Sequence, residues 1–198
     1  MKKLFWTFLS IVLICLSVSA QHVKKPSLQD YAARLKEVKT LTSNFVEEKH
    51  LALLSQPMQS TGTLNFDKDA QKLRWQYKTP FENGFLIEKN RISRLKNSQK
   101  QPIQNAMGRL MAGQMLQWLT LDFDTLSKTY LITLNGQEII FTPRDKNNQA
   151  VKLITVWLDE KDSRIVHRVK MDNPNGDFVL WRFSDTKLNP QLQDGVFL

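Results

Sequence analysis

The sequence is poor in the residues that usually hold metals or do redox chemistry. It has one cysteine and three histidines in 198 residues. Cys15 lies in the first apolar run, so a chain cleaved after that run has neither disulfides nor thiol chemistry. His22, His50 and His167 are far apart and lie in no H-x-x-x-H spacing. We therefore expect no metal site and no other cofactor.

Catalytic motifs are also missing. The chain has no glycine-rich phosphate loop and no G-x-S-x-G sequence. Glu47 and Glu48 are adjacent in a predicted strand, where neighbours point to opposite faces, so they cannot act together as general acid and base. Asp122 and Asp124 lie at a predicted helix start, where capping explains them. We expect no catalytic residues and no enzyme.

Long apolar runs are lacking after residue 20. Before it, Lys2 and Lys3 precede an apolar run over 4–16, and small residues follow at 18–20. This order is typical of a secretory signal peptide, and we expect cleavage between Ala20 and Gln21. The run is short for a membrane span, so we expect no anchor. The prediction is export to the periplasm of a Gram-negative bacterium.

The rest of the chain has no linker and no repeat, and its glycines and prolines are scattered singly. We therefore expect residues 21–198 to form a single domain. Lysine and arginine outnumber aspartate and glutamate by 28 to 19. Export makes nucleic acid a poor partner for this charge, which suits anionic lipid head groups or acidic proteins instead.

Two helices are predicted. Ser27 and Asp30 form a capping-box pattern, and apolar residues recur at helical spacing from Leu28 to Val38. A second helix is predicted from about Pro102 to Leu119. Three methionines follow one another in it at i+4 spacing: Met107, Met111 and Met115.

Most of the remaining chain alternates between apolar and polar residues, which predicts strands. Asn135-Gly136 and Asn175-Gly176 mark tight hairpins, so the sheet should be antiparallel. Some strands are apolar on both faces, as in Phe178 to Phe183. Such a sheet must be covered twice, or covered once and left with a concavity that something else fills.

The residues from Phe45 to Pro80 carry a family resemblance. They read F-V-E-E-K-H-L-A-L-L-S-Q-P-M-Q-S-T-G-T-L-N-F, then a turn, then L-R-W-Q-Y-K-T-P. This resembles the LolA-like periplasmic lipoprotein carriers in a Phe-rich first strand, a second strand containing Gly62, and an Arg74-Trp75 strand followed by Pro80. The late segment Leu188-Asn189-Pro190, with Phe197, is similar to the family's C-terminal end.

The resemblance implies a mainly β fold with few helices: an incomplete antiparallel β-barrel whose concave apolar face is closed by helices. It also implies a cavity for the acyl chains of a lipoprotein or lipid-like cargo, carried from inner to outer membrane by a monomer. The implied partners are the cargo, an inner-membrane transporter, an outer-membrane acceptor and, transiently, the membrane surface. The residues expected to contact cargo are Leu64, Phe66, Trp75, Tyr77, Met107, Leu110, Met111, Met115, Trp118 and Ile132.

The chain departs from the family pattern in two places. Lys68-Asp69-Ala70 stands where the carriers usually have Arg-Pro, and the segment from Glu88 to Ile92 replaces an Asp-Gly turn. These differences leave the cargo open between a lipoprotein and another lipid. The alternative function is a non-enzymatic accessory or binding module of an envelope lipid or polyene export system.

Overall fold

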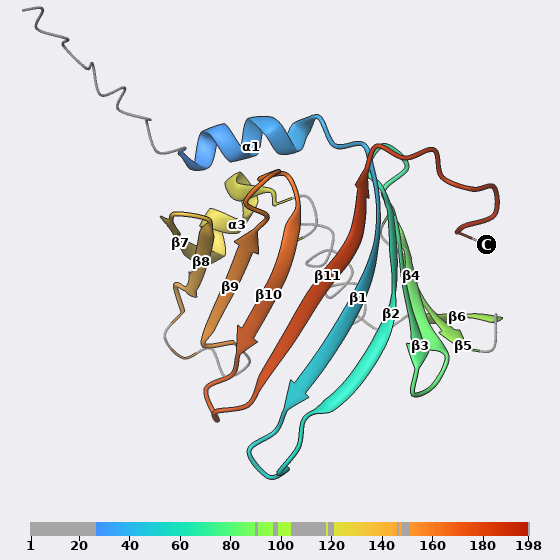
Figure 1. The fold of residues 1–198 in the computed structure, drawn as a ribbon, viewed down its shortest axis with the longest axis horizontal. Helices are drawn as coiled ribbons and strands as arrows, with labels where there is room; N and C mark the ends of the chain where they lie inside the picture. Colours follow the sequence, from blue (N-terminus) through green and yellow to red (C-terminus); the bar gives the residue numbers. More distant parts are fainter. Residues whose placement is uncertain are drawn as a thin grey trace, which may run out of the picture.

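The computed structural model describes residues 27–89, 91–96, 99–103, 118, 121–145, 147 and 151–197. Among these residues, two helices with defined bounds, α1 (Leu28–Lys36) and α3 (Phe123–Thr129), accompany one large sheet (Figure 1). Its strands are β1 (Thr40–His50), β2 (Met58–Asp67), β3 (Lys72–Thr79), β4 (Asn83–Glu88), β5 (Arg91–Lys96), β6 (Gln99–Ile103), β7 (Tyr130–Asn135), β8 (Glu138–Pro143), β9 (Leu153–Leu158), β10 (Val166–Asp172) and β11 (Phe178–Leu188).

The eleven strands form a single antiparallel sheet in the order β6-β5-β4-β3-β2-β1-β11-β10-β9-β8-β7. The chain builds one half outward from β1 to β6, restarts at the opposite edge with β7, and returns so that its last strand pairs with its first (Figure 1). The sheet is strongly curved but remains open, with β6 and β7 as its edges. The predicted mainly β, incomplete-barrel fold is confirmed.

The helix cap and the glycine-containing turns that the sequence predicts are present in the structure. Ser27 caps α1, its hydroxyl accepting from the Asp30 amide while the Asp30 carboxylate accepts from the Ser27 amide. Gly136 has a φ of +62° in the β7–β8 turn, and Gly176 a φ of +92° between β10 and β11. Asn135 pairs with Glu138, so Gly136 and Gln137 are the two turn residues, one position later than Asn-Gly alone suggests.

The predicted second helix is only partly testable. Pro102 belongs to β6, so the prediction that a helix begins there is wrong. A proline is tolerated at this position because β6 is an edge strand that pairs only with β5 among the described strands. Trp118 is helical, and the methionines at 107, 111 and 115 lie outside the described residues. Within the described chain, no helix has the length and apolar character needed to cross a bilayer.

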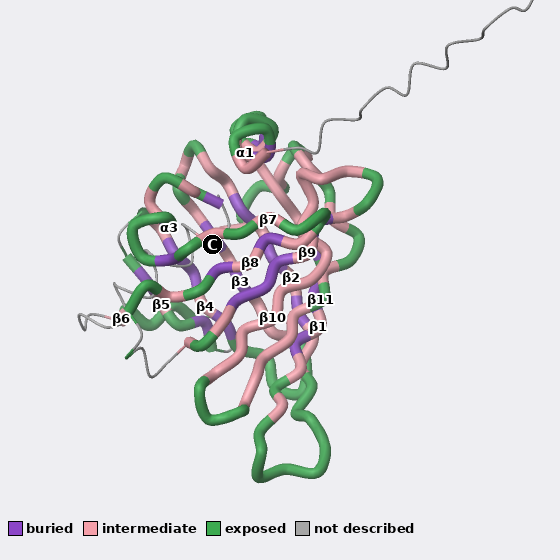
Figure 2. The backbone as a smooth tube through the Cα atoms, turned by 90° about the vertical axis from the view of Figure 1, so that its left-hand side faces the viewer, coloured by how far each residue is buried: buried purple, intermediate pink, exposed green. Residues whose placement is uncertain are grey.

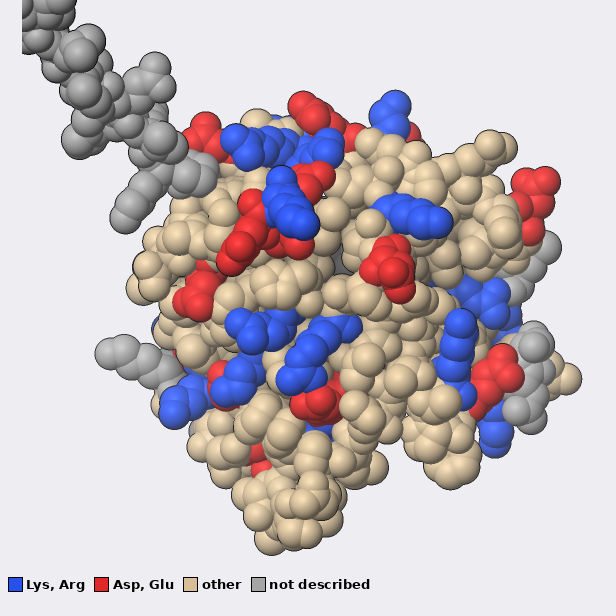
Figure 3. Space-filling model, viewed as in Figure 1, with Lys and Arg blue, Asp and Glu red and all other residues tan. Residues whose placement is uncertain are grey.

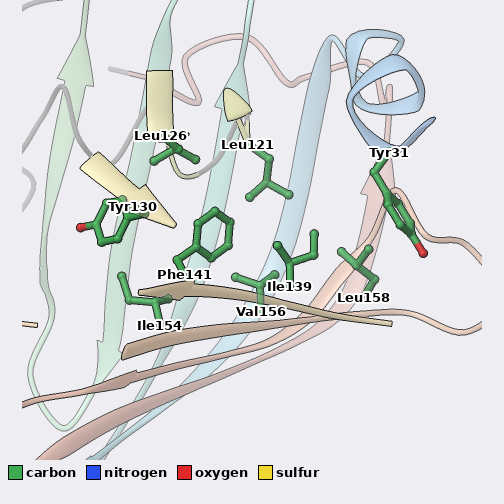
Figure 4. Packing of buried hydrophobic residues seen from close by; sticks show 9 residues of the cluster. All are labelled: Tyr31, Leu121, Leu126, Tyr130, Ile139, Phe141, Ile154, Val156 and Leu158. Atoms are coloured by element: carbon green, nitrogen blue, oxygen red, sulfur yellow. The ribbon is translucent and has the colours of Figure 1, made fainter. Parts of the chain in front are cut away.

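Two separate hydrophobic clusters occupy the inner face of the sheet. One gathers side chains of α1, α3 and β7–β9 around Ile139 and Phe141, both fully buried (Figure 4). The other lies on β1–β5 around Leu73 and Ile87. Buried segments run through the interior, while the tip of the β1–β2 hairpin is exposed (Figure 2). The core is therefore divided in two, with β10 and β11 between the halves.

The outer face of β9–β11 explains the strands that are apolar on both sides. Arg168 lies over the Trp157 ring, with its guanidinium carbon 3.9 Å from the ring centroid, and Lys170 lies 4.4 Å from that of Phe178. His50 stacks on Phe178 at 4.1 Å. Basic side chains gather over these strands (Figure 3). In the part of the chain that the structure describes, long cationic side chains thus cover this face with their apolar stems, and no helix lies over it.

Candidate functional site

A cavity of about 520 Å³ lies between the two hydrophobic clusters. Its size is within the range of small-molecule binding sites, and its walls are largely apolar. The inner faces of β10 and β11 form the floor between the clusters, and Leu35 of α1 and Val38, just after this helix, lie at one end. The floor residues are Val166, Val169, Met171, Val179, Trp181 and Phe183.

The structure places five of the predicted cargo residues on the cavity wall: Leu64, Phe66, Trp75, Tyr77 and Trp118. Four of them come from β2 and β3, in one half of the sheet, and Trp118 comes from the segment before α3. Ile132 lies apart from them, on β7, where it packs against the cluster of β7–β9. Met107, Leu110, Met111 and Met115 lie outside the described residues.

An aromatic group holds the β1–β3 side of the cavity in shape. The Trp75 ring lies 4.4 Å from that of Phe45 and 6.2 Å from that of Phe183, measured between centroids. Gly62 makes the first contact possible, because a Cβ there would collide with the Phe45 ring and with the Gln76 carbonyl oxygen. Aromatic pairs at these spacings add to the stability gained from burial alone. These contacts pack the wall closely on the β1–β3 side.

A carboxylate interrupts the apolar wall. The Glu47 side chain is 2% exposed, and its Oε2 accepts hydrogen bonds from the Tyr77 hydroxyl at 2.8 Å and the Trp181 indole N–H at 2.7 Å. Its Oε1 lies 3.1 Å from the ammonium of Lys49 and accepts no well-aligned hydrogen bond among the described residues. Burial, together with the Glu47 charge, raises the pKa of Tyr77 above its ordinary value of 10.0.

Glu48 points to the other face, as strand alternation predicts. There Arg182 donates to its Oε1 at 2.6 Å, and this hydrogen bond holds the pKa of the Glu48 carboxyl below its usual value. Glu47 and Glu48 therefore occupy different environments and share no substrate. Among the described residues, no three His, Cys, Asp or Glu side chains gather in a way that could hold a metal ion.

The α1 end of the cavity is closed by a helix with a few polar tethers. Arg34 donates to the Ser163 hydroxyl at 3.0 Å, and Lys68 donates to the Lys36 carbonyl at 3.3 Å. Asn189, which follows β11, accepts from the Lys39 amide at 2.7 Å and thereby fixes the link from α1 to β1. These are exposed contacts, and each contributes little to stability. The main attachment of α1 is apolar, because Tyr31 is 1% exposed within the cluster of β7–β9.

Sequence reasoning missed the cavity residues of β10 and β11 and the pair formed by Glu47 and Lys49. One signal was present. Phe45, Glu47 and Lys49 alternate along one strand and so share a face, which puts two charges on an apolar surface. Strand alternation alone does not show which face of the sheet lines the cavity.

Structural comparison shows the fold again in proteins of very different sequence. An uncharacterized conserved protein from Thermus thermophilus superposes with a TM-score of 0.56 at 9% identity, over 87% of this chain and 93% of that one. The structure of the Pseudomonas aeruginosa MucA/MucB complex matches with a TM-score of 0.52 at 14% identity. That match covers 84% of this chain but 57% of the other. Among curated proteins, no sequence matches significantly.

A family model covers nearly the whole described chain. The model described as "Outer membrane lipoprotein carrier protein LolA" matches residues 36–198. The match begins at the end of α1 and takes in every strand of the sheet, including both walls of the cavity. The chain therefore belongs to the LolA family of outer membrane lipoprotein carrier proteins.

Proposed function

We propose that the protein binds the acyl chains of a lipoprotein or a related lipid in this cavity and carries them from the inner to the outer membrane. The observation that carries the proposal is the apolar cavity between two separately packed cores, in a chain of this family. A void of this kind leaves apolar walls in water, so a guest that fills it gains the hydrophobic free energy that the empty protein lacks.

The hydrophobic free energy gained on binding an acyl chain has to be limited, because a carrier must also release its cargo. Burying a methylene contributes about 0.8 kcal/mol, so a fully enclosed sixteen-carbon chain would gain roughly 13 kcal/mol before the costs of association. Complete enclosure would make release too slow. Release therefore requires that part of the enclosure opens at a membrane or a partner.

The proposal includes the partners and compartment expected from the sequence. Residues 1–20 are proposed as the export signal, cleaved between Ala20 and Gln21, and they lie outside the described residues. Residues 21–198 are proposed to act as a monomeric single-domain carrier in the periplasm, loaded by an inner-membrane transporter and unloaded by an outer-membrane acceptor. Met107, Leu110, Met111 and Met115 stay proposed cargo contacts.

The β1–β2 hairpin supports the transient membrane contact. Residues 51–58 carry no charge, and Leu53 at their tip is 98% exposed, with Leu54 and Met58 also exposed (Figures 2 and 3). Asp177 accepts from the Ala52 amide at 2.7 Å and so holds the tip in place. An uncharged tip with exposed leucines gains free energy by entering the interface of a bilayer.

Purification from a periplasmic extract followed by lipid extraction tests the function. Mass spectrometry of the purified protein, and of protein that has been delipidated and reloaded, should show acyl species at about one load per chain. A protein that carries no lipid but retains a protein partner would support the accessory module instead.

A further inference from the structure

Glu47 is the one charged side chain in the cavity wall that is almost fully buried, among the residues the structure describes. Burying an ionised carboxylate costs several kcal/mol unless it is paired and hydrogen-bonded. Replacing a buried ion pair with apolar side chains is often neutral or stabilising. Stability alone therefore gives little reason for a carboxylate between aromatic side chains, and its role must lie in what it holds.

What it holds is the ammonium of Lys49. The Tyr77 hydroxyl and the Trp181 N–H both donate to Oε2, which fixes the carboxylate and leaves Oε1 facing Lys49 at 3.1 Å. A free lysine side chain samples many rotamers, and this contact restricts it. The Lys49 side chain is 46% exposed and lines the cavity, so its ammonium is reachable from inside.

An ammonium has three N–H donors, and in the described part of the chain Glu47 is its one ion-pair partner. At least one donor therefore remains for a ligand. The nearby carboxylate already balances the positive charge, so a fully anionic group would approach Glu47 unfavourably. A neutral acceptor meets no such repulsion. Every acyl chain carries one where its apolar part ends, in the carbonyl oxygen of its ester or amide.

Building on the proposed carrier function, we infer that Lys49, positioned by Glu47, is a binding site for the ester or amide carbonyl of the cargo's acyl chain. The chain then lies along the apolar floor of β10 and β11, with its carbonyl at the Lys49 end, next to the exposed β1–β2 hairpin. Lys49 thus distinguishes acyl groups from plain alkyl chains, and it sets the direction in which the cargo enters.

A matched ligand pair tests the inference. Palmitoyl lysophosphatidylcholine and its hexadecyl ether analogue share a head group and differ in one carbonyl. A charge-assisted hydrogen bond should make the wild-type protein bind the ester about tenfold more tightly. Lys49→Met should abolish this preference, and Lys49→Arg should keep it. The readout is the ratio of the two Kd values, from displacement of a fluorescent alkyl probe.

Lys78→Met is the control, because Lys78 is an exposed lysine on β3 outside the described cavity lining, and it should leave the ratio unchanged. A third ligand, a short neutral peptide with an N-palmitoyl amide, shows whether the carbonyl recognised comes from a glyceride or from an acylated peptide. Equal binding of ester and ether by the wild type overturns the inference, as does a preference that survives Lys49→Met. If the wild type binds neither lipid, the carrier function fails as well.

Discussion

Replacing Val169 with phenylalanine tests whether the cavity is a binding site or a packing defect of the hydrophobic core. Val169 lies on β10, faces the cavity, and is paired across the sheet with Trp181 and Val156. Phenylalanine has four more side-chain heavy atoms and displaces about four methylene groups of cargo. At about 0.8 kcal/mol each, binding weakens by about 3 kcal/mol, which is roughly a 200-fold increase in Kd.

The stability of the same variant should move little. The added ring enters space that is empty in the unloaded protein, so the free energy of unfolding should stay within about 1 kcal/mol of the wild type or rise. In a filled core, the same change costs about 1–3 kcal/mol through overpacking. Urea unfolding measures the stability, and titration with a fluorescent fatty acid measures the binding.

Val46→Phe is the matched control, because Val46 lies on β1 and points to the opposite face from Phe45 and Glu47. It should leave the fatty-acid Kd unchanged. Unaltered binding by Val169→Phe, or a loss of stability with no loss of affinity, would refute the reasoning that this void receives the cargo.

Three further predictions concern single positions. Gly62→Ala should lower the free energy of unfolding by about 1–3 kcal/mol, seen in urea melts, because the new methyl collides with Phe45. Burial and the neighbouring carboxylate raise the pKa of Tyr77, so wild-type stability should fall as the pH rises above about 10, and Tyr77→Phe should lessen that alkaline loss in urea midpoints measured against pH. Leu53→Asp should weaken flotation with phospholipid vesicles about tenfold, whereas Leu131→Asp, at an exposed leucine of the β7 edge, should not; equal flotation of both would remove the hairpin from membrane contact.

Much of the fold was predictable because its signals are local. The capping box of Ser27 and Asp30 joins residues three apart, and the Gly136 turn joins adjacent strands. Strand alternation correctly grouped Leu64, Phe66, Trp75 and Tyr77 on one face. The pairing of β11 with β1 was beyond this reasoning, because it joins residues 128 to 147 positions apart and no local pattern marks it.

The polar part of the cavity was missed for a related reason. Alternation shows that Glu47 and Lys49 share a face, but a charged residue on a strand ordinarily indicates the solvent side. Only the assembled sheet brings Tyr77 and Trp181 to the same carboxylate oxygen. Ile132 is the opposite case, an apolar residue that was expected at the cavity and does not line it. Its alternation is that of a buried strand face, but β7 is an edge strand, and Ile132 packs against the cluster of β7–β9.

The two unpaired edges of the sheet affect how widely the proposed binding cavity can open. A closed ring of strands has a fixed circumference, whereas here β6 and β7 end the ladder, and Lys100 and Pro102 on β6 discourage another strand from adding there. Twist between neighbouring strands varies by many degrees at small cost. Small changes of twist, distributed over eleven strands, can widen or narrow the distance between the two edge strands without breaking any backbone hydrogen bond.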